Sequence, residues 1–114
     1  MLYLGNDNAI VVEDLKDPWA SSGAGEWIIT ALSATGQLKD ATGELGEGAN
    51  IGSAITLTYY AQRDGVTGHF WVGVVEEDHA ALVAGNAVDV QVTITASSDR
   101  VYKTTQRHSV VRRT

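Results

Sequence analysis

The chain has 114 residues with a formal net charge of −6, no cysteine, 44% hydrophobic residues and 19% charged residues. This length and composition exclude a disordered chain and predict one domain with one core, and the lack of cysteine excludes disulfides and thiolate metal sites. No run approaches the ~18 apolar residues of a membrane-spanning helix, and the start lacks the features of a signal peptide, so we expect a soluble protein.

The first quarter of the chain predicts one strand followed by a loop. Residues 8–15 form a strand of mixed pattern, which ends before Pro18 because proline fixes φ and removes a hydrogen-bond donor from the ladder. Residues 19–26 are rich in serine, glycine and alanine, which is typical of a loop. Trp19 and Trp27 flank this segment and are expected to hold it in place.

Strict alternation predicts the next strand at residues 32–39, since successive side chains of a strand point to opposite faces. The residues expected to face the core are Leu32, Ala34, Gly36 and Leu38. Residues 40–43 then predict a hairpin turn in which Gly43 supplies a positive φ. A second glycine-rich loop follows at residues 46–48.

Two strands joined by a turn are predicted between residues 55 and 75. In the first, the row expected to face the core is Ile55, Leu57 and Tyr59. Residues 62–65 turn the chain into the second strand. There the inward row is expected to be Phe70, Val72 and Val74, which places Trp71 on the opposite face. Trp71 is then either covered by another segment or exposed as an anchor for a partner protein.

The clearest alternation lies at residues 88–95, and it organises the fold. The inward row is Val88, Val90, Val92 and Ile94. A turn at residues 97–99 leads to a closing strand at residues 101–111. With about seven short antiparallel strands and no sustained helical period, residues 1–114 predict a single all-β sandwich domain with a basic C-terminal strand and tail.

Charge is divided unevenly along the chain. Residues 1–99 hold all 14 acidic residues and only three basic ones, whereas residues 100–114 hold five basic residues and no acid. The basic end is either a solvated strand with a loose tail or a segment that docks on an acidic surface, such as that of a neighbouring copy. An acidic body repels phosphate, which argues against nucleic acid as the partner. The candidate protein-contacting residues are Trp71, Arg100, Lys103, Arg107, His108, Arg112 and Arg113.

The sequence contains no pattern that indicates catalysis, a metal or a cofactor. Residues 76–79, Glu-Glu-Asp-His, are the densest polar cluster, but four consecutive side chains cannot converge on one cation. His69, His79 and His108 lack the spacing of a zinc site, and no Gly-x-Ser-x-Gly turn is present. The glycine-rich loop at 46–48 is followed by a strand rather than by a phosphate-binding helix. We therefore expect a protein that is not an enzyme and needs no cofactor.

Several short segments resemble a family of small tailed-bacteriophage proteins across nearly the full length. They are the opening at residues 4–8, Leu-Lys-Asp-Ala-Thr-Gly at 38–43, Asp64-Gly65 before the strand, Leu82-x-x-Gly85, and Val-Val-Arg-Arg at 110–113. The chain departs from that family in its glycine-rich 43–52 loop and in Trp71. The resemblance implies an immunoglobulin-like antiparallel β-sandwich encoded among virion structural genes, with a role in the head, the neck or the tail.

Under this resemblance we expect a virion building block, assembled in the bacterial host cytoplasm, that contacts other virion proteins and copies of itself and no membrane. A head decoration or head–tail connector (neck) protein is the leading interpretation, and a tail or baseplate adaptor is the first alternative. The second alternative is a free-standing module that binds carbohydrate or a host protein. Its aromatic candidates are Trp19, Trp27 and Trp71, because carbohydrate readers usually expose several aromatic side chains.

Overall fold

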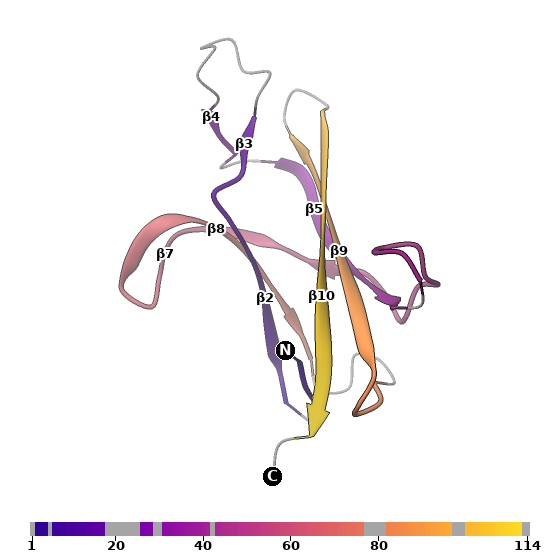
Figure 1. Cartoon of the computed structure of the whole chain (residues 1–114). Helices are drawn as coiled ribbons and strands as arrows, with labels where there is room; N and C mark the ends of the chain where they lie inside the picture. Colours follow the sequence, from indigo (N-terminus) through magenta and orange to yellow (C-terminus); the bar gives the residue numbers. More distant parts are fainter. Residues whose placement is uncertain are drawn as a thin grey trace.

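The described chain is built from strands alone (Figure 1). The structure, a computed structural model, describes residues 2–4, 6–17, 26–28, 31–41, 43–76, 82–96 and 100–112. The strands are β1 (Leu2–Leu4), β2 (Asn8–Glu13), β3 (Lys16–Asp17), β4 (Glu26–Trp27), β5 (Ala31–Asp40), β6 (Ile55–Thr56), β7 (Thr58–Arg63), β8 (Val66–Val75), β9 (Ala87–Ala96) and β10 (Val101–Arg112). The all-β prediction is therefore confirmed for these residues.

A five-stranded sheet in the order β1-β10-β9-β5-β6 forms one layer. β9 lies in its centre and pairs antiparallel with β5 on one side and with β10 on the other. As predicted, the apolar row of β9 faces the interior, since Val88, Val90, Val92 and Ile94 are all buried. The polar row faces outward, so this sheet has one dry and one largely polar face.

The second layer is a three-stranded antiparallel sheet in the order β2-β8-β7, and here the predicted orientation of β8 is wrong. Trp71 and Val75 belong to the core, whereas Val72 and Val74 lie on the outer face. Phe70 is buried as predicted, at 7% exposed, but it lies outside the core cluster, with its ring covering Gly68. The reason is that β8 is apolar on both faces, so alternation did not fix its orientation. The wide indole fills the interior instead.

The start of β5 also differs from the prediction. Leu32 is 64% exposed, while Ala34 and Leu38 are buried as expected. The pairing of β5 with β9 shifts between Ala31 and Ser33, which is a β-bulge. Since one extra residue moves a side chain to the other face, the bulge turns Leu32 outward.

The two layers are joined where the chain passes from β6 to β7. β6 pairs with β5 in the five-stranded sheet, and two residues later β7 pairs with β8 in the other sheet. Gly73 of β8 makes this crossing possible, because a Cβ atom there would lie 2.4 Å from Leu57 Cδ2 and 3.0 Å from the carbonyl oxygen of Thr56. This edge of the sandwich is thus closed by a single stretch of chain.

The opposite edge is closed by side-chain hydrogen bonds. Asn8 accepts a hydrogen bond from the Tyr3 amide and donates to the Tyr3 and Asn6 carbonyls, which holds the turn between β1 and β2. β1 runs parallel to the end of β10 in the first sheet, while β2 belongs to the second. Gln106 of β10 donates to the Val11 carbonyl of β2 over 2.9 Å.

The two predicted turns differ in outcome. Asp64 and Gly65 have φ of 53° and 80°, and they connect Arg63 to Val66 in a two-residue hairpin, as expected. Gly43 has the expected positive φ of 83°, but no tight hairpin forms there. The chain returns to β5 only at Asn50, which forms an isolated bridge with Lys39, so residues 43–49 form a wide loop.

Candidate functional site

Among the described side chains of β10, the basic residues Lys103 and Arg107 share one face, and the candidate His108 lies on the other. Lys103 and Arg107 lie on the outer face of the five-stranded sheet, opposite Thr93 and Asp89 of β9. His108 lies opposite Val88 and therefore faces the interior side. Arg100 is exposed just before the strand. The side chain of Arg112 and all of Arg113 lie outside the described residues.

Arg107 is engaged within the molecule by a fully buried carboxylate. Its Nε donates to Asp89 Oδ1 over 2.7 Å, and its Nη2 donates to Asp89 Oδ2 over 3.1 Å. This bidentate pair lowers the pKa of Asp89, an effect that burial opposes and the Gly46 amide supports. The same hydrogen bond raises the pKa of Arg107. Asp89 was missing from the predicted site residues, although its position in the polar row of the clearest strand was visible in the sequence.

The Asp89–Arg107 pair also holds the wide loop against the sheet. The Gly46 amide donates to Asp89 Oδ2 over 2.8 Å, and Arg107 Nη2 donates to the Gly43 carbonyl over 3.2 Å. Gly46 is buried over Thr105 and Gln91 and has a φ of 81°. The ion pair therefore supplies hydrogen-bond partners to two backbone groups of the loop. Arg107 thus has a structural role and is not a charge that is free to dock on another protein.

His108 and Gln106 form a second polar contact on the inward side of β10. His108 Nε2 and Gln106 Oε1 are 3.0 Å apart, while the Gln106 amide bridges to β2. Burial lowers the pKa of His108, because the charged imidazolium is poorly solvated there. His108 thus belongs to the closure of the sandwich edge, which the sequence did not indicate.

The aromatic residues form a stacked cluster beside the core. Trp71 is 5% exposed, and its indole N–H donates to the Ile28 carbonyl over 2.8 Å. Its interpretation as an exposed partner anchor is therefore wrong. Tyr59 Oη is 2.8 Å from His69 Nδ1, and the His69 ring stacks on Trp27 with centroids 4.4 Å apart. The cluster attaches the β3–β4 hairpin to the three-stranded sheet.

This arrangement bears on the carbohydrate alternative. Trp27 is 39% exposed, but His69 stacks on its ring and the Lys16 ammonium lies over the ring at 4.4 Å. These two groups therefore already occupy part of the ring surface on which a sugar would stack. Trp71 is inside the core, and Trp19 lies outside the described residues.

The outer face of the three-stranded sheet is apolar, and its exposed part is formed by Ala9, Tyr60 and Val74, since Phe70 is buried and Val11 and Val72 are half-buried. In register across the three strands lie Glu13, Phe70 and Tyr60, then Val11, Val72 and Thr58, then Ala9 and Val74. Tyr60 is 50% exposed and Val74 is 48% exposed. We call this surface the apolar face, and it consists of Ala9, Val11, Tyr60, Phe70, Val72 and Val74. Glu13 is its one charged neighbour in these registers.

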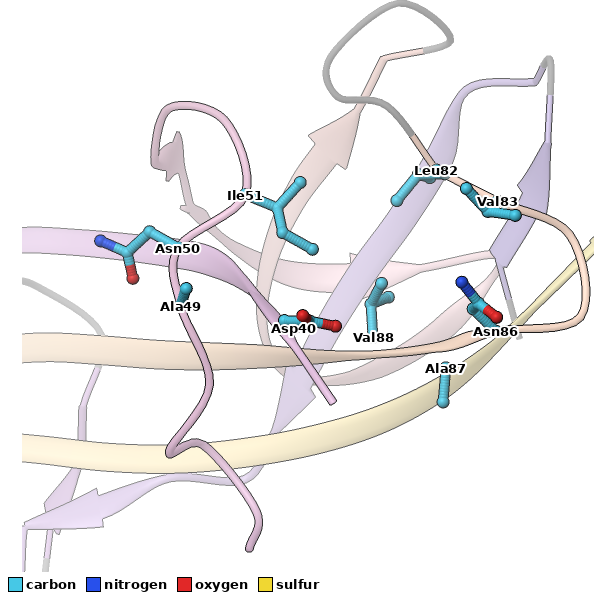
Figure 2. Close-up of a pocket in the computed structure, with 9 residues that line it drawn as sticks. All are labelled: Asp40, Ala49, Asn50, Ile51, Leu82, Val83, Asn86, Ala87 and Val88. Atoms are coloured by element: carbon cyan, nitrogen blue, oxygen red, sulfur yellow. The ribbon is translucent and has the colours of Figure 1, made fainter. Parts of the chain in front are cut away.

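A shallow pocket lies where β5 ends and β9 begins (Figure 2). Its volume is about 290 Å³, and its walls come from residues 49–51 on one side and residues 82–88 on the other. Ile51, Leu82 and Val88 supply apolar surface, and Asp40 supplies the one charged group. Figure 2 shows the Asn50 amide turned away from Val88, so the polar groups do not converge on a common point.

Within the described residues, no three side chains of His, Cys, Asp or Glu are grouped as a metal would require. Of the polar cluster at 76–79, only Glu76 lies within the described residues, where it is exposed. The part of the chain that the structure describes contains no helix long and apolar enough to cross a membrane. Comparison of the chain with protein-family models, curated proteins and solved structures gave no match.

Proposed function

We propose that the chain is a non-enzymatic structural protein of a tailed-bacteriophage virion, with an immunoglobulin-like sandwich, that acts by binding other virion proteins. Head decoration or a head–tail connector is the leading role, and a tail or baseplate adaptor is the alternative. The sequence resemblance at residues 4–8, 38–43 and 110–113 supports this assignment.

The strand order supports the immunoglobulin-like part of the proposal. Immunoglobulin-like sandwiches pack a sheet that contains the C, F and G strands against one that contains B, E and D. Here β5, β9 and β10 take the C, F and G places, and β2, β8 and β7 take the B, E and D places. β1 adds to β10 in parallel, and β6 follows β5 as an extra edge strand. The β3–β4 hairpin is an insertion between the B and C places.

The observation that carries the functional proposal is the apolar face. A sheet at the surface of a sandwich normally alternates apolar inward and polar outward residues, as β9 does. β8 instead presents Val72 and Val74 outward while burying Trp71 and Val75 inward. Exposed and contiguous apolar surface marks a contact site for another protein.

The chemistry of this face favours a protein partner. In the registers of Ala9, Val11 and Glu13, this face carries one carboxylate, Glu13, and no basic residue, so it offers nothing there to a phosphate backbone. Valine and tyrosine side chains gain free energy when they leave water against another apolar surface, at about 25 cal/mol for each Å² buried. A neighbouring subunit provides such a surface repeatedly in a symmetric particle.

Binding to particles tests the proposal. Purified protein is mixed with capsid-like particles, with isolated tails and with a set of glycans, and co-sedimentation or retention is measured. We expect particle binding by the natural chain and a severe loss of that binding in Val74→Lys. The matched control is Val101→Lys, because Val101 is 54% exposed on the outer side of the other sheet.

Four results are distinguishable. Loss in Val74→Lys with retention in Val101→Lys supports the proposal, and preference for heads or tails decides between its two versions. Equal loss in both variants assigns binding to charge rather than to the apolar face. Binding to glycans without binding to particles replaces the proposal by the carbohydrate module. Binding to none of these samples refutes it.

A further inference from the structure

Most of the outer edge of β10 has no neighbouring strand in the described residues. β10 is 12 residues long, and β1 pairs with it only from Val110 to Arg112. Residues 101–109 pair with β9 on one side alone. Figure 1 shows β10 running along the molecule well past the short strand at the N-terminus. We call residues 101–109 the open edge.

The hydrogen bonds at the two ends of the open edge show which way its backbone groups point. The Val110 amide donates to the Asn86 carbonyl, and the Val110 carbonyl accepts from the Gly85 amide. At the other end, the Arg100 carbonyl accepts from the Ala96 amide. Backbone groups alternate between the two sides of a strand, so the even-numbered residues bond to the β9 side. The residues whose amides and carbonyls point away from β9 are Val101, Lys103, Thr105, Arg107 and Ser109. No hydrogen bond to these backbone groups is seen in the part of the chain that the structure describes.

The open edge has the composition of a strand, and charged side chains are its protection. It contains no proline, and its pairing with β9 has no register shift. Valine, tyrosine and threonine, which it contains, favour strands. Proteins block edge pairing with short strands, proline, bulges or charges, lysine above all. Here Lys103 is exposed on the edge. A lysine repels an approaching strand that carries bases, but it attracts one that carries carboxylates.

Positive charge is concentrated at the start of the open edge. On the outer face of the sheet, the row of Lys103 continues through Thr93 and Thr35, so no carboxylate lies beside it in that row. Further along, Arg107 is already engaged in its ion pair. The loop at residues 43–49, which Arg107 contacts, carries two exposed acidic residues. The region around Lys103 is therefore where a negative charge is best accommodated.

We propose that the open edge binds an extended acidic segment of a different protein, which adds to the five-stranded sheet as a strand and sets a carboxylate opposite Lys103. Hydrogen bonds to the backbone of the open edge supply the affinity, and the carboxylate supplies the preference among strands. Residues 100–114 hold five basic residues and no acid, so this end of the chain favours an acidic segment over a neutral or basic one. The inference goes beyond the proposed function and concerns a surface other than the apolar face.

The charges disfavour a second copy of this chain as the occupant. Two open edges paired antiparallel about their midpoint, Thr105, would set Lys103 of each copy opposite Arg107 of the other. Like charges that face each other destabilise a strand pair. The other long edge strands do not supply carboxylates at alternate positions, because β7 is Thr-Tyr-Tyr-Ala-Gln-Arg and β2 has one acid, Glu13, at its last position. A strand of another protein, with carboxylates along one face, meets the requirement.

Peptide binding to the purified chain tests the inference. The probe is a fluorescent peptide that alternates Glu and Val and matches the open edge in length. A twin peptide has Lys in place of every Glu, and a block peptide has the composition of the probe with all Glu residues together. Alternation places every carboxylate on one face of an added strand. By fluorescence anisotropy at low salt, we expect the probe to bind at least several-fold more tightly than the block peptide, and the Lys twin not to bind.

Charge reversal at Lys103 locates the contact. Lys103→Glu should reverse the preference, so that the Lys twin binds more tightly than the probe. Lys16→Glu is the matched control, because it makes the same change of net charge at an exposed lysine of β3 and should leave the preference unchanged. Val74→Lys, on the apolar face, should bind the probe about as well as the natural chain does. Failure of this inference and failure of the proposed function are therefore distinguishable. Circular dichroism confirms that each variant is folded.

Amide hydrogen exchange, followed by NMR, detects the added strand itself. The amides of Lys103, Thr105 and Arg107 point to the open edge, so they should exchange more slowly once the probe is bound. The amides of Thr104 and Gln106 face β9 already and should change little. A peptide held by charge alone would slow neither set.

Each outcome supports or overturns the inference. Tighter binding of the probe, reversed by Lys103→Glu and accompanied by slowed exchange at alternate residues of β10, supports it. Equal binding of the probe and the block peptide, or unchanged exchange along β10, shows attraction without a new strand and overturns it. Equal binding of the probe and the Lys twin, or a preference that survives Lys103→Glu, overturns the acidic occupant. Slowed exchange along β2 or β7 instead of β10 places the peptide on another edge and overturns it, as does the absence of binding by every peptide.

Discussion

Asp89 and Arg107 lie directly opposite each other on β9 and β10, and their side chains form a bidentate ion pair with distances of 2.7 and 3.1 Å. The pair also accepts the Gly46 amide and donates to the Gly43 carbonyl. It therefore fixes the loop at residues 43–49 on the outer face of the five-stranded sheet. A surface loop rich in glycine has little apolar contact of its own, so the ion pair helps to order it, together with the hydrogen bond from the Asp40 amide to the Ala49 carbonyl.

Asp89→Asn should destabilise the protein, because the shape of the side chain is kept while its charge is lost. One buried carboxylate oxygen becomes an amide nitrogen, which is a donor and faces another donor. Leaving these buried groups without an acceptor costs roughly 1–3 kcal/mol. The free energy of unfolding in urea gives the value. Gln91→Glu, a change of similar size in the same outward row, is the control and should have a smaller effect. Equal stability of Asp89→Asn and the natural chain would show that the ion pair is not needed for the loop.

The stability difference between the natural chain and Asp89→Asn should depend on pH in a defined direction. Arg107 lowers the pKa of Asp89 in the folded state below its ordinary value of 3.8, so the folded state holds this proton less tightly than the unfolded state. The contribution is complete above pH 3.8 and is lost as the pH falls through the lowered folded pKa. Urea unfolding at a series of pH values should show a constant difference near neutrality that shrinks only in strong acid. A difference that shrinks between neutrality and pH 5 would contradict this assignment.

Gly73→Ala should destabilise the protein at the point where the chain crosses between the sheets. The new Cβ would lie 2.4 Å from Leu57 Cδ2 and 3.0 Å from a backbone oxygen, which cannot move without the strand. Overpacking of this kind costs about 1–3 kcal/mol. Gly36→Ala is the matched control, because its Cβ would meet only side-chain atoms, the nearest at 3.2 Å. Thermal unfolding should rank Gly73→Ala below Gly36→Ala, and the reverse order would mean that β6 and β8 are further apart than described.

Trp71→Phe should cost more than Trp27→Phe. The first change removes the indole N–H that satisfies the buried Ile28 carbonyl, with a penalty of roughly 1–3 kcal/mol for the unpaired group in addition to lost volume. The second keeps an aromatic ring against His69 at a position that is already 39% exposed. Denaturant unfolding of both variants decides the point. Similar losses in the two variants would place Trp71 nearer the surface.

The residues that were and were not predictable differ in a physical way. Val88 to Ile94 alternate with polar residues, so burial of one face follows from the sequence. β8 carries valine and aromatic residues on both faces, and only the width of the Trp71 ring and the need for glycine at position 73 select the inner one. Leu32 follows the alternation in sequence, but a bulge set by pairing with β9 reverses it. Asp89 and Arg107 are 18 residues apart, and only strand register brings them together.

The pairing of β10 with its neighbouring strands also affects how docking by the basic C-terminal end can be tested. Val110 is buried and pairs with Leu2, so truncation after Gln106 would disturb the sheet as well as remove charge. Arg107→Ser should lower stability for the reason given for Asp89. Point variants that spare the ion pair are therefore the appropriate test of docking.

Lys103→Ser combined with Arg100→Ser should leave the melting temperature within about a degree or two of the natural value, since an exposed surface charge contributes little to stability. Lys103 is exposed on the outer side of β10.

If the basic end docks on an acidic surface of a neighbouring virion protein, this double variant should enter particles less completely. For the natural chain, added salt should reduce incorporation towards the level of the variant, because exposed charges are screened within about 8 Å at physiological ionic strength. Particles assembled in the presence of each protein, purified and quantified by gel over a series of salt concentrations, provide the measurement. Equal incorporation of the natural chain and the double variant at every salt concentration would show that the basic end is a solvated strand, and that docking depends on the apolar face alone.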